Sequence, residues 1–301
     1  MAISRSQLLK ELLPGLNALF GLEYSKYGDE HAEIYETETS DRSFEEETKL
    51  SGFGSAPTKS EGASIEYDTA QEAFTARYTH ETVAMGFAIT EEAIEDNLYD
   101  SLSARYTKAL ARAMAYSKQV KAASLLNGAF SGTTYGDGKV LCATDHPLVS
   151  GGANSNRPTV GADLNETSLE AAVIQIGQWT DERGLKIATQ PKKLIIPSDL
   201  QFVATRLLET EGRVGTADND INALSNNGSV PGGYAVNHYL TEPNAWFLTT
   251  DIPNGMKHFV RAKMATSMDA DFDTGNSRYK ARERYSFGVS DPLGIFGSPG
   301  A

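Results

Sequence analysis

Cys142 and His146 are the two residues of this sequence that could form a nucleophile and its base. A cysteine thiol activated by a nearby imidazole is a common nucleophile in hydrolases. However, His146 stands between Asp145 and Pro147 in a glycine-rich segment, which is typical of a turn. No second cysteine is present to complete a zinc site. We interpret this segment as turn structure, and a soluble hydrolase that uses Cys142 and His146 is kept as a rival hypothesis.

Three aspartates, Asp269, Asp271 and Asp273, have the spacing of the first ligands of a calcium-binding loop. In such a loop a glycine makes the sharp turn and a glutamate closes the site, but here Thr274 and Lys280 occupy those positions. We therefore predict no metal site, no cofactor and no catalytic residues, and leave open an ion bound near Asp269–Asp273.

The strongest local charge anomaly is a row of four cations at alternate positions: Arg278, Lys280, Arg282 and Arg284. Apolar residues alternate with them, which predicts a strand with one apolar and one basic face. Like charges in a row repel unless something negative covers them. We predict an acid–base contact between protein surfaces and expect it between subunits. The candidate covers, in the same chain or a neighbour, are the acidic segment Glu45, Glu46 and Glu47 and the acidic first turns of a long predicted helix, 91–127. A solvated face and a nucleic-acid contact are the alternatives.

The chain as a whole is acidic, with 27 Lys and Arg against 40 Asp and Glu, so its net charge is −13. This balance argues against a dedicated polyanion-binding protein, because phosphate neutralisation needs clustered cations.

A length of 301 residues with 40% hydrophobic residues is typical of a globular protein of about two domains. The single cysteine excludes an internal disulfide. Lys10 and Glu11 interrupt the leucine-rich N-terminal stretch, so we predict no secretory signal and assembly in the cytoplasm.

A long hairpin is predicted in the first third of the chain. An acidic segment, 31–50, precedes a Gly/Ser/Pro-rich stretch, 51–62, and apolar residues then alternate from Ile65 onward. We expect two long antiparallel strands joined by a glycine-rich tip. Such a hairpin buries little of its own surface, so it needs a partner.

The next predicted elements are a long helix and a compact α+β unit. The helix spans 91–127, with Thr90 as N-cap and Gly128 after its end. At about 1.5 Å per residue it is on the order of 50 Å long and must cross more than one packing unit. Beyond it, a capping box at Thr167–Glu170 predicts a helix to about Arg183. Strands are expected near 193–196, 234–236, 246–248, 256–261 and 278–289, and another helix over 198–208.

This order of parts resembles the major capsid protein of tailed phages, with the Hong Kong 97-type fold. Three segments are similar to the Mu-like major head subunit family in particular: Ala88-Ile-Thr-Glu-Glu-Ala-Ile-Glu-Asp-Asn97, Ala143-Thr-Asp-His-Pro-Leu148 and Pro191-Lys-Lys-Leu-Ile-Ile-Pro197. The resemblance runs from about Glu30 onward, whereas the first 25 residues match only as a generic arm.

The resemblance implies an α+β fold and a division of the chain. The expected parts are an N-terminal arm (1–29), an extended loop (30–82), a peripheral domain (83–139 and 255–301) with its spine helix (91–127), and an axial domain (140–254). It also implies a non-enzymatic subunit of the icosahedral head of a tailed double-stranded DNA phage or prophage. The implied partners are other copies of itself in pentamers and hexamers, scaffold or protease, portal and decoration proteins, and packaged DNA held by weak contacts, with no membrane. An encapsulin-type nanocompartment shell is the alternative within the same fold.

Overall fold

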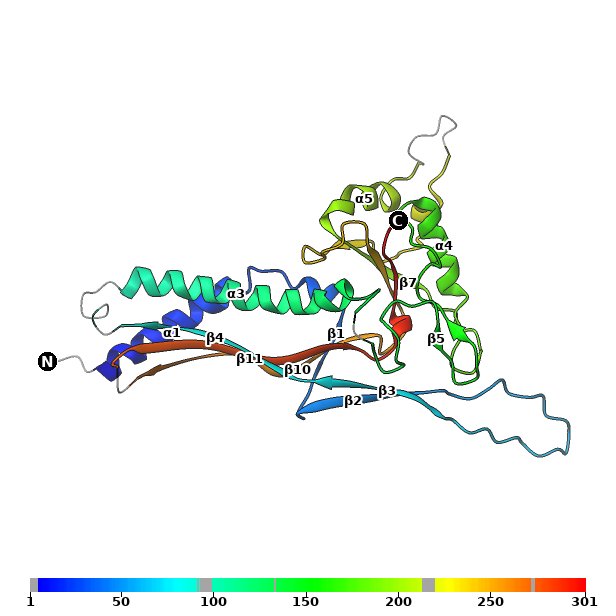
Figure 1. The fold of residues 1–301 in the computed structure, drawn as a ribbon, viewed down its shortest axis with the longest axis horizontal. Coiled ribbons are helices and arrows are strands. Elements are labelled where there is room, and N and C mark those ends of the chain that lie inside the picture. The colour runs from blue at the N-terminus through cyan, green and yellow to red at the C-terminus, as the bar shows by residue number, and fades with distance from the viewer. Residues whose placement is uncertain (1–4, 91, 93–98, 133, 213–219, 272–273) are drawn as a thin grey trace.

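The computed structural model describes residues 5–90, 92, 99–132, 134–212, 220–271 and 274–301. Figure 1 shows three parts: a long flat layer of helices on a sheet, a compact unit with its own sheet, and a narrow hairpin that extends away from both. The mixed α+β class is the one that the sequence predicted.

The long layer is built on a four-stranded sheet in the order β1-β10-β11-β4. Its strands are β1 (Glu36–Thr39), β4 (Glu81–Ile89), β10 (Met256–Ala270) and β11 (Ser277–Val289). β1 is parallel to β10, and the other pairs are antiparallel. The predicted alternation of β11 is confirmed, since Tyr279, Ala281 and Tyr285 are buried while Lys280 and Arg282 are exposed.

Two helices, α1 (Arg5–Tyr24) and α3 (Tyr99–Asn127), cover the apolar face of this sheet (Figure 1). Leu16 and Phe20 of α1 pack with Met114 of α3 and Tyr279 of β11. The helix start predicted after Thr90 lies outside the described residues, whereas the predicted helix end at Asn127 is confirmed.

The long helix crosses two cores, as its length predicts. Leu110 and Met114 lie in the core formed with α1, and Leu126 lies in a second core with Phe247 and Ile295. The buried face of the helix consists largely of alanines, Ala111, Ala115, Ala122 and Ala123, whose small side chains let the helix approach its neighbours closely.

The compact unit contains a second four-stranded sheet, in the order β12-β9-β7-β8. Its strands are β7 (Pro191–Ile196), β8 (Tyr234–Val236), β9 (Trp246–Thr250) and β12 (Ile295–Ser298). The segment 255–301 therefore divides between the two sheets, because β12 pairs with β9 and not with β10 or β11.

The helices of the compact unit are α4 (Glu166–Gly177), α5 (Gln201–Leu208) and the short α6 (Ala223–Asn226). Turns of 3₁₀ helix lie at Ser198–Leu200 and Pro292–Gly294, and a third, Glu30–Glu33, precedes β1. The capping box of α4 is formed by Asn165 and Ser168, so the predicted start at Thr167 is wrong. The amide side chain of Asn165 accepts from the Ser168 backbone as well as a threonine would, which explains the displacement.

The predicted hairpin exists but is paired over a shorter length. β2 (Phe44–Leu50) pairs with β3 (Glu72–Thr79), and the residues between them form a long narrow loop (Figure 1). Ile65 and Tyr67 lie in that loop and are exposed, so their predicted strand is wrong. Their alternation has no opposite strand to pair with. A two-stranded pair, β5 (His146–Pro147) and β6 (Ala153–Asn154), completes the fold.

Candidate assembly surfaces

The row of cations predicted on β11 lies on the sheet face opposite the helices. Arg278 forms an ion pair with Asp271 at 2.5 Å. Within the described part of the chain, neither Lys280 nor Arg282 has an ion-pair partner. Arg284 is half-buried, and its Nε atom has no hydrogen-bond partner among the described residues. Two cations of the row are thus exposed and unneutralised.

Small residues flank these cations on both neighbouring strands. Opposite Lys280 stand Gly86 of β4 and Ser267 of β10, and opposite Arg282 stand Ala84 and Ala265. None of these neighbours carries charge or reaches beyond the cations, so the row is accessible to an extended segment laid across the sheet. We define the basic face as Lys280, Arg282 and Arg284.

The acidic segment predicted to cover this row already has partners in its own chain. Glu45 accepts a hydrogen bond from Ser40 Oγ at 2.6 Å, and Glu46 lies 3.7 Å from Arg77. Glu47 binds the buried Lys257 and the Ser290 hydroxyl. The structure does not bring Glu45, Glu46 or Glu47 to the basic face, and their role between subunits stays a prediction.

Exposed acids lie further along the hairpin. Glu66 and Asp68 lie in the loop before β3, and Glu72 is the first residue of β3. Glu66 and Glu72 are exposed. The exposed loop between β2 and β3, residues 52–71, also presents Phe53 and Tyr67, whose exposed fractions are 63% and 88%. We call this segment the hairpin loop.

Two ion-pair clusters fix the hairpin to the compact unit of the same chain. At its base, Lys49 Nζ lies 3.0 Å from Glu182 and 2.8 Å from Asp291. Further out, Arg183 binds both carboxylate oxygens of Asp68 at 2.9 Å. Burial alone lowers the pKa of Lys49, but the charges and hydrogen bonds of Asp291 and Glu182 outweigh it and raise that pKa above its usual value. Lys49 is therefore a half-buried cation held between two carboxylates.

A buried glutamate on β11 was missed in the sequence because it lies on the apolar face. Glu283 is 3% exposed, and its nearest cation, Lys118 of α3, is 3.9 Å away. Burial raises the pKa of Glu283 to about 7, although Lys118 opposes the shift. His258, whose charge Lys118 also opposes, has its pKa lowered to about 3, chiefly by burial. The only sequence signal was a carboxylate at a position where the alternation requires an apolar residue.

The variant Glu283→Gln tests this buried charge. Folded Glu283 takes up its proton near pH 7 and the unfolded chain near 4.5, so the native state binds more protons between these values. The free energy of unfolding of the wild type therefore falls as the pH rises through this interval. We expect Glu283→Gln to be more stable than the wild type at pH 8, by up to about 3 kcal/mol, and equal to it near pH 4.5. Urea unfolding at both pH values measures this difference, with the exposed Glu46→Gln as control. An equal advantage at both values would contradict it.

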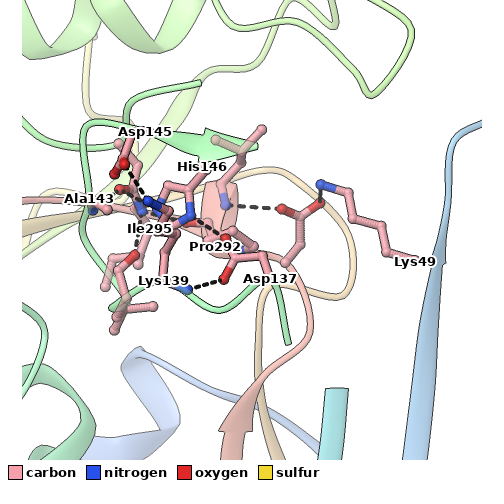
Figure 2. Close-up of polar contacts among 12 residues, drawn as sticks. Lys49, Asp137, Lys139, Ala143, Asp145, His146, Pro292 and Ile295 are labelled. Atoms are coloured by element: carbon pink, nitrogen blue, oxygen red, sulfur yellow. Dashed lines mark hydrogen bonds and ion pairs between the residues drawn. The ribbon is translucent and has the colours of Figure 1, made fainter. Parts of the chain in front are cut away.

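Cys142 and His146 do not form a nucleophile and base. Cys142 is fully buried between the two sheets, and burial raises the pKa of its thiol. His146 instead contacts Asp137 at 2.5 Å and Asn156 at 3.0 Å, as Figure 2 shows for Asp137. These contacts explain the Asp-His-Pro segment as part of a polar structural network.

The predicted calcium-like spacing is not assembled into a site in the described residues. Asp271 binds Thr274 and Arg278, and Asp273 lies outside the described residues. No group of three potential metal-binding side chains is found in the part of the chain that the structure describes. Among the described residues, no helix is long and apolar enough to cross a membrane.

Comparison with known protein families shows to which family this chain belongs. A family model described as phage capsid protein matches residues 72–297, which is most of the chain. The chain belongs to the phage capsid protein family. This phage capsid protein is accordingly a structural component of the virion, and the family confirms the prediction that it is not an enzyme.

Solved structures confirm the Hong Kong 97-type fold of this capsid protein. The capsid of cyanophage P-SCSP1u is 12% identical, with a TM-score of 0.57 over 88% of this chain and 85% of that chain. A virus-like particle from Pyrococcus furiosus is 10% identical, with a TM-score of 0.53 over 96% and 99%. The capsid of an empty GTA particle is 14% identical, with a TM-score of 0.55 over 88% and 87%. No curated protein matches the sequence.

Proposed function

We infer that this capsid protein is the major subunit of the icosahedral head of a tailed double-stranded DNA phage or prophage, and that its copies assemble in rings of five and six. The observation that carries this inference is that one chain presents both an exposed hairpin loop and an uncovered basic face. Each is incomplete alone, and a contact between different surfaces of identical copies generates rings and closed shells. Membership of the phage capsid protein family supports a phage head as the shell that these copies form.

In this proposal each part of the subunit has its own position in a ring of copies. The hairpin at 30–82 reaches the neighbouring copy, and the helical layer with its sheet forms the periphery of each ring. The compact unit, 140–254 together with β12, lies toward the ring axis. The three motif similarities around Ala88, Ala143 and Pro191 support a place for the protein among the Mu-like major head subunits.

Other partners follow from the same proposal. A head shell requires a portal and a scaffold or protease during assembly, and decoration proteins bind some shells. Packaged DNA is held weakly, because a chain of net charge −13 repels phosphates on most of its surface. Any attraction for DNA is confined to local groups of cations.

An encapsulin-type shell is the second candidate. It is favoured by the particle from Pyrococcus furiosus, whose likeness extends over 96% of this chain. The two candidates differ in cargo, since an encapsulin encloses protein and a phage head encloses DNA.

The test is to express the chain alone and within its native gene cluster, and to examine the purified material by negative-stain electron microscopy. We expect closed shells or rings from the protein alone and DNA-filled particles from the cluster. A permanently monomeric protein would refute self-assembly, and shells filled with a specific protein would favour the encapsulin-type function.

A further inference from the structure

Helix α3 carries a second group of exposed cations. Its described range, Tyr99–Asn127, contains five Lys or Arg residues and a single acid, Asp100. This balance is the reverse of that of the whole chain, which has 27 basic and 40 acidic residues. A local excess of positive charge on an acidic protein marks a place where an anion can bind.

The five cations of α3 divide into two sets by their partners. Lys121 pairs with Glu81, and Lys118 lies 3.9 Å from the buried Glu283. The other three are exposed, and none of them has an ion-pair partner among the described residues. These three residues, which we call the helix row, are Arg105, Lys108 and Arg112.

The helix row lies on one side of α3. Its members are three and four positions apart, and residues at these separations share one face of a helix. Leu110 and Met114, which pack with Leu16 and Phe20 of α1, lie on the other side. At about 1.5 Å per residue the row is about 10 Å long. It is therefore a short line of positive charge that points away from the apolar core.

The acid at the end of α1 does not neutralise the helix row. Glu23 pairs with Lys26 of the same chain at 2.8 Å. The pKa of Glu23 is lowered chiefly by its hydrogen bond with Lys26, and the charge of Lys108 adds to this effect. Because Lys26 already balances Glu23, the charge of Lys108 remains in excess.

The helix row and the basic face lie on opposite sides of one layer. Figure 1 shows α3 along one side of the long layer, with the four-stranded sheet on its other side. Lys280 and Arg282 belong to the sheet face that the helices do not cover. In the proposed shell the hairpin of a neighbouring copy covers the basic face. The helix row is then left for a different anion.

We propose that the helix row binds the phosphate backbone of packaged double-stranded DNA, an inference that rests on the proposed function in a phage head. DNA carries one negative charge per about 1.7 Å of its axis, so a row about 10 Å long faces about six phosphates. Arg105 and Arg112 can each bind a phosphate through two parallel N–H donors, and Lys108 adds a point charge. All three cations can therefore be neutralised at once.

The shape of the surface favours DNA over an acidic segment of another copy. The backbone N–H and C=O groups inside a helix bond to each other, so α3 offers no edge to which an extended peptide could add as a strand. A rigid rod of phosphates needs only the exposed side chains. The row therefore fits a duplex better than it fits a peptide.

The strength of the contact follows from the number of cations. Three phosphate contacts predict that the binding constant falls about 40-fold when the salt concentration rises fourfold. The rest of a chain of net charge −13 repels phosphates, so each copy holds DNA weakly. Many copies in one shell add up to a firm hold, whereas each single contact opens readily when DNA leaves.

Photocrosslinking of filled particles tests where the packaged DNA contacts the shell. Particles made from the native gene cluster are irradiated with ultraviolet light and digested with nuclease and protease. Mass spectrometry then identifies the peptides that carry a nucleotide. We expect such adducts in residues 99–116 and not in residues 277–289, which contain the basic face. Adducts in 277–289 with none in 99–116 would overturn the proposal.

Arg105→Gln with Arg112→Gln removes two charges of the row without reversing any. We expect this variant to form shells in wild-type yield and to lose most of the adducts in residues 99–116. Lys186→Gln with Lys192→Gln gives the same change in net charge at two exposed positions elsewhere and should keep the adducts. If the arginine variant fails to form shells while this control assembles, the row contacts another copy and the DNA proposal is wrong.

The salt dependence of binding counts the contacts directly. Subunits with Lys280→Glu and Arg282→Glu are expected to be folded and unassembled, so added DNA reaches α3 and cannot bind the reversed basic face. Fluorescence anisotropy with a labelled duplex of about 20 bp should show binding about 40-fold weaker at about 80 mM salt than at about 20 mM. Adding Arg105→Gln and Arg112→Gln should reduce this factor to about 3.5. Equal factors in the two proteins would overturn the proposal.

The proposed function and this inference fail in different ways. A chain that forms no shells, alone or with its gene cluster, would refute the head function and this inference with it. Filled particles without adducts on α3 would leave the head function intact and overturn this inference alone.

Discussion

Reversing two charges of the basic face, Lys280→Glu together with Arg282→Glu, is expected to abolish shell formation while the subunit stays folded. Both side chains are exposed and have no ion-pair partner among the described residues, so their loss leaves no buried group unpaired. Arg284 is omitted because it is half-buried. In the assembly, each reversed charge would face acids of the neighbouring hairpin loop, and like charges at an interface cost several kcal/mol. Sedimentation velocity and negative-stain microscopy measure shells, and circular dichroism measures folding.

A charge-swap design identifies the occupant of the basic face. Glu66→Lys with Glu72→Lys should also prevent assembly, and the four changes combined should restore it in part. Lys186→Glu with Lys192→Glu gives the same change in net charge at two exposed positions elsewhere and should assemble normally. Normal shells from the first double variant would exclude an acid–base contact there. Shells that form but fail to retain DNA would indicate that the basic face contacts the packaged genome.

Lys49→Met is expected to destabilise the subunit and release the base of the hairpin. Lys49 is 19% exposed in its side chain, and its two partners, Glu182 and Asp291, are 4% and 14% exposed. Removing the cation leaves two buried carboxylates close together, and breaking such a pair costs about 3–5 kcal/mol. Urea unfolding measures this loss, and limited proteolysis of residues 51–71 measures the release of the hairpin.

The matched control is Lys59→Met, which removes an exposed lysine from the hairpin loop itself. We expect it to change the free energy of unfolding by less than about 0.5 kcal/mol. If Lys49→Met is as stable and as resistant to protease as this control, Lys49 does not hold the hairpin to the body.

The elements with a strict period were predictable from the sequence. From Tyr279 to Val289 of β11 every second residue is apolar except Glu283, and the residues between them are cations or small residues, so only a strand with two unlike faces satisfies the pattern. The end of α3 at Asn127 was predictable because the glycine-containing segment beyond it cannot continue an apolar helix face. The exposed hairpin loop was recognisable from its glycines, serines and acids, which provide nothing to bury.

Features that depend on contacts between distant residues were not predictable. Ile65 and Tyr67 alternate as a strand does, yet no strand lies beside them. Glu283 is tolerated on an apolar face because Lys118, 165 positions earlier, lies close to it. Asn156 looked like any loop asparagine, and only the fold brings Leu141, Pro292 and Ile295 to its amide. β12 belongs to the second sheet because the chain turns at Pro292 after β11, and β12 then pairs with β9.

The packing of α1 has a consequence for any trimming of the amino terminus. Leu16 and Phe20 cover Met114 and Tyr279, so a cut after Tyr24 followed by loss of the freed helix would leave these side chains facing solvent. A trimmed molecule would expose an apolar patch on the layer that α1 covers in the intact molecule. We expect such a molecule to associate non-specifically. Purification tags that require proteolytic removal should therefore be cut upstream of Arg5, or placed elsewhere.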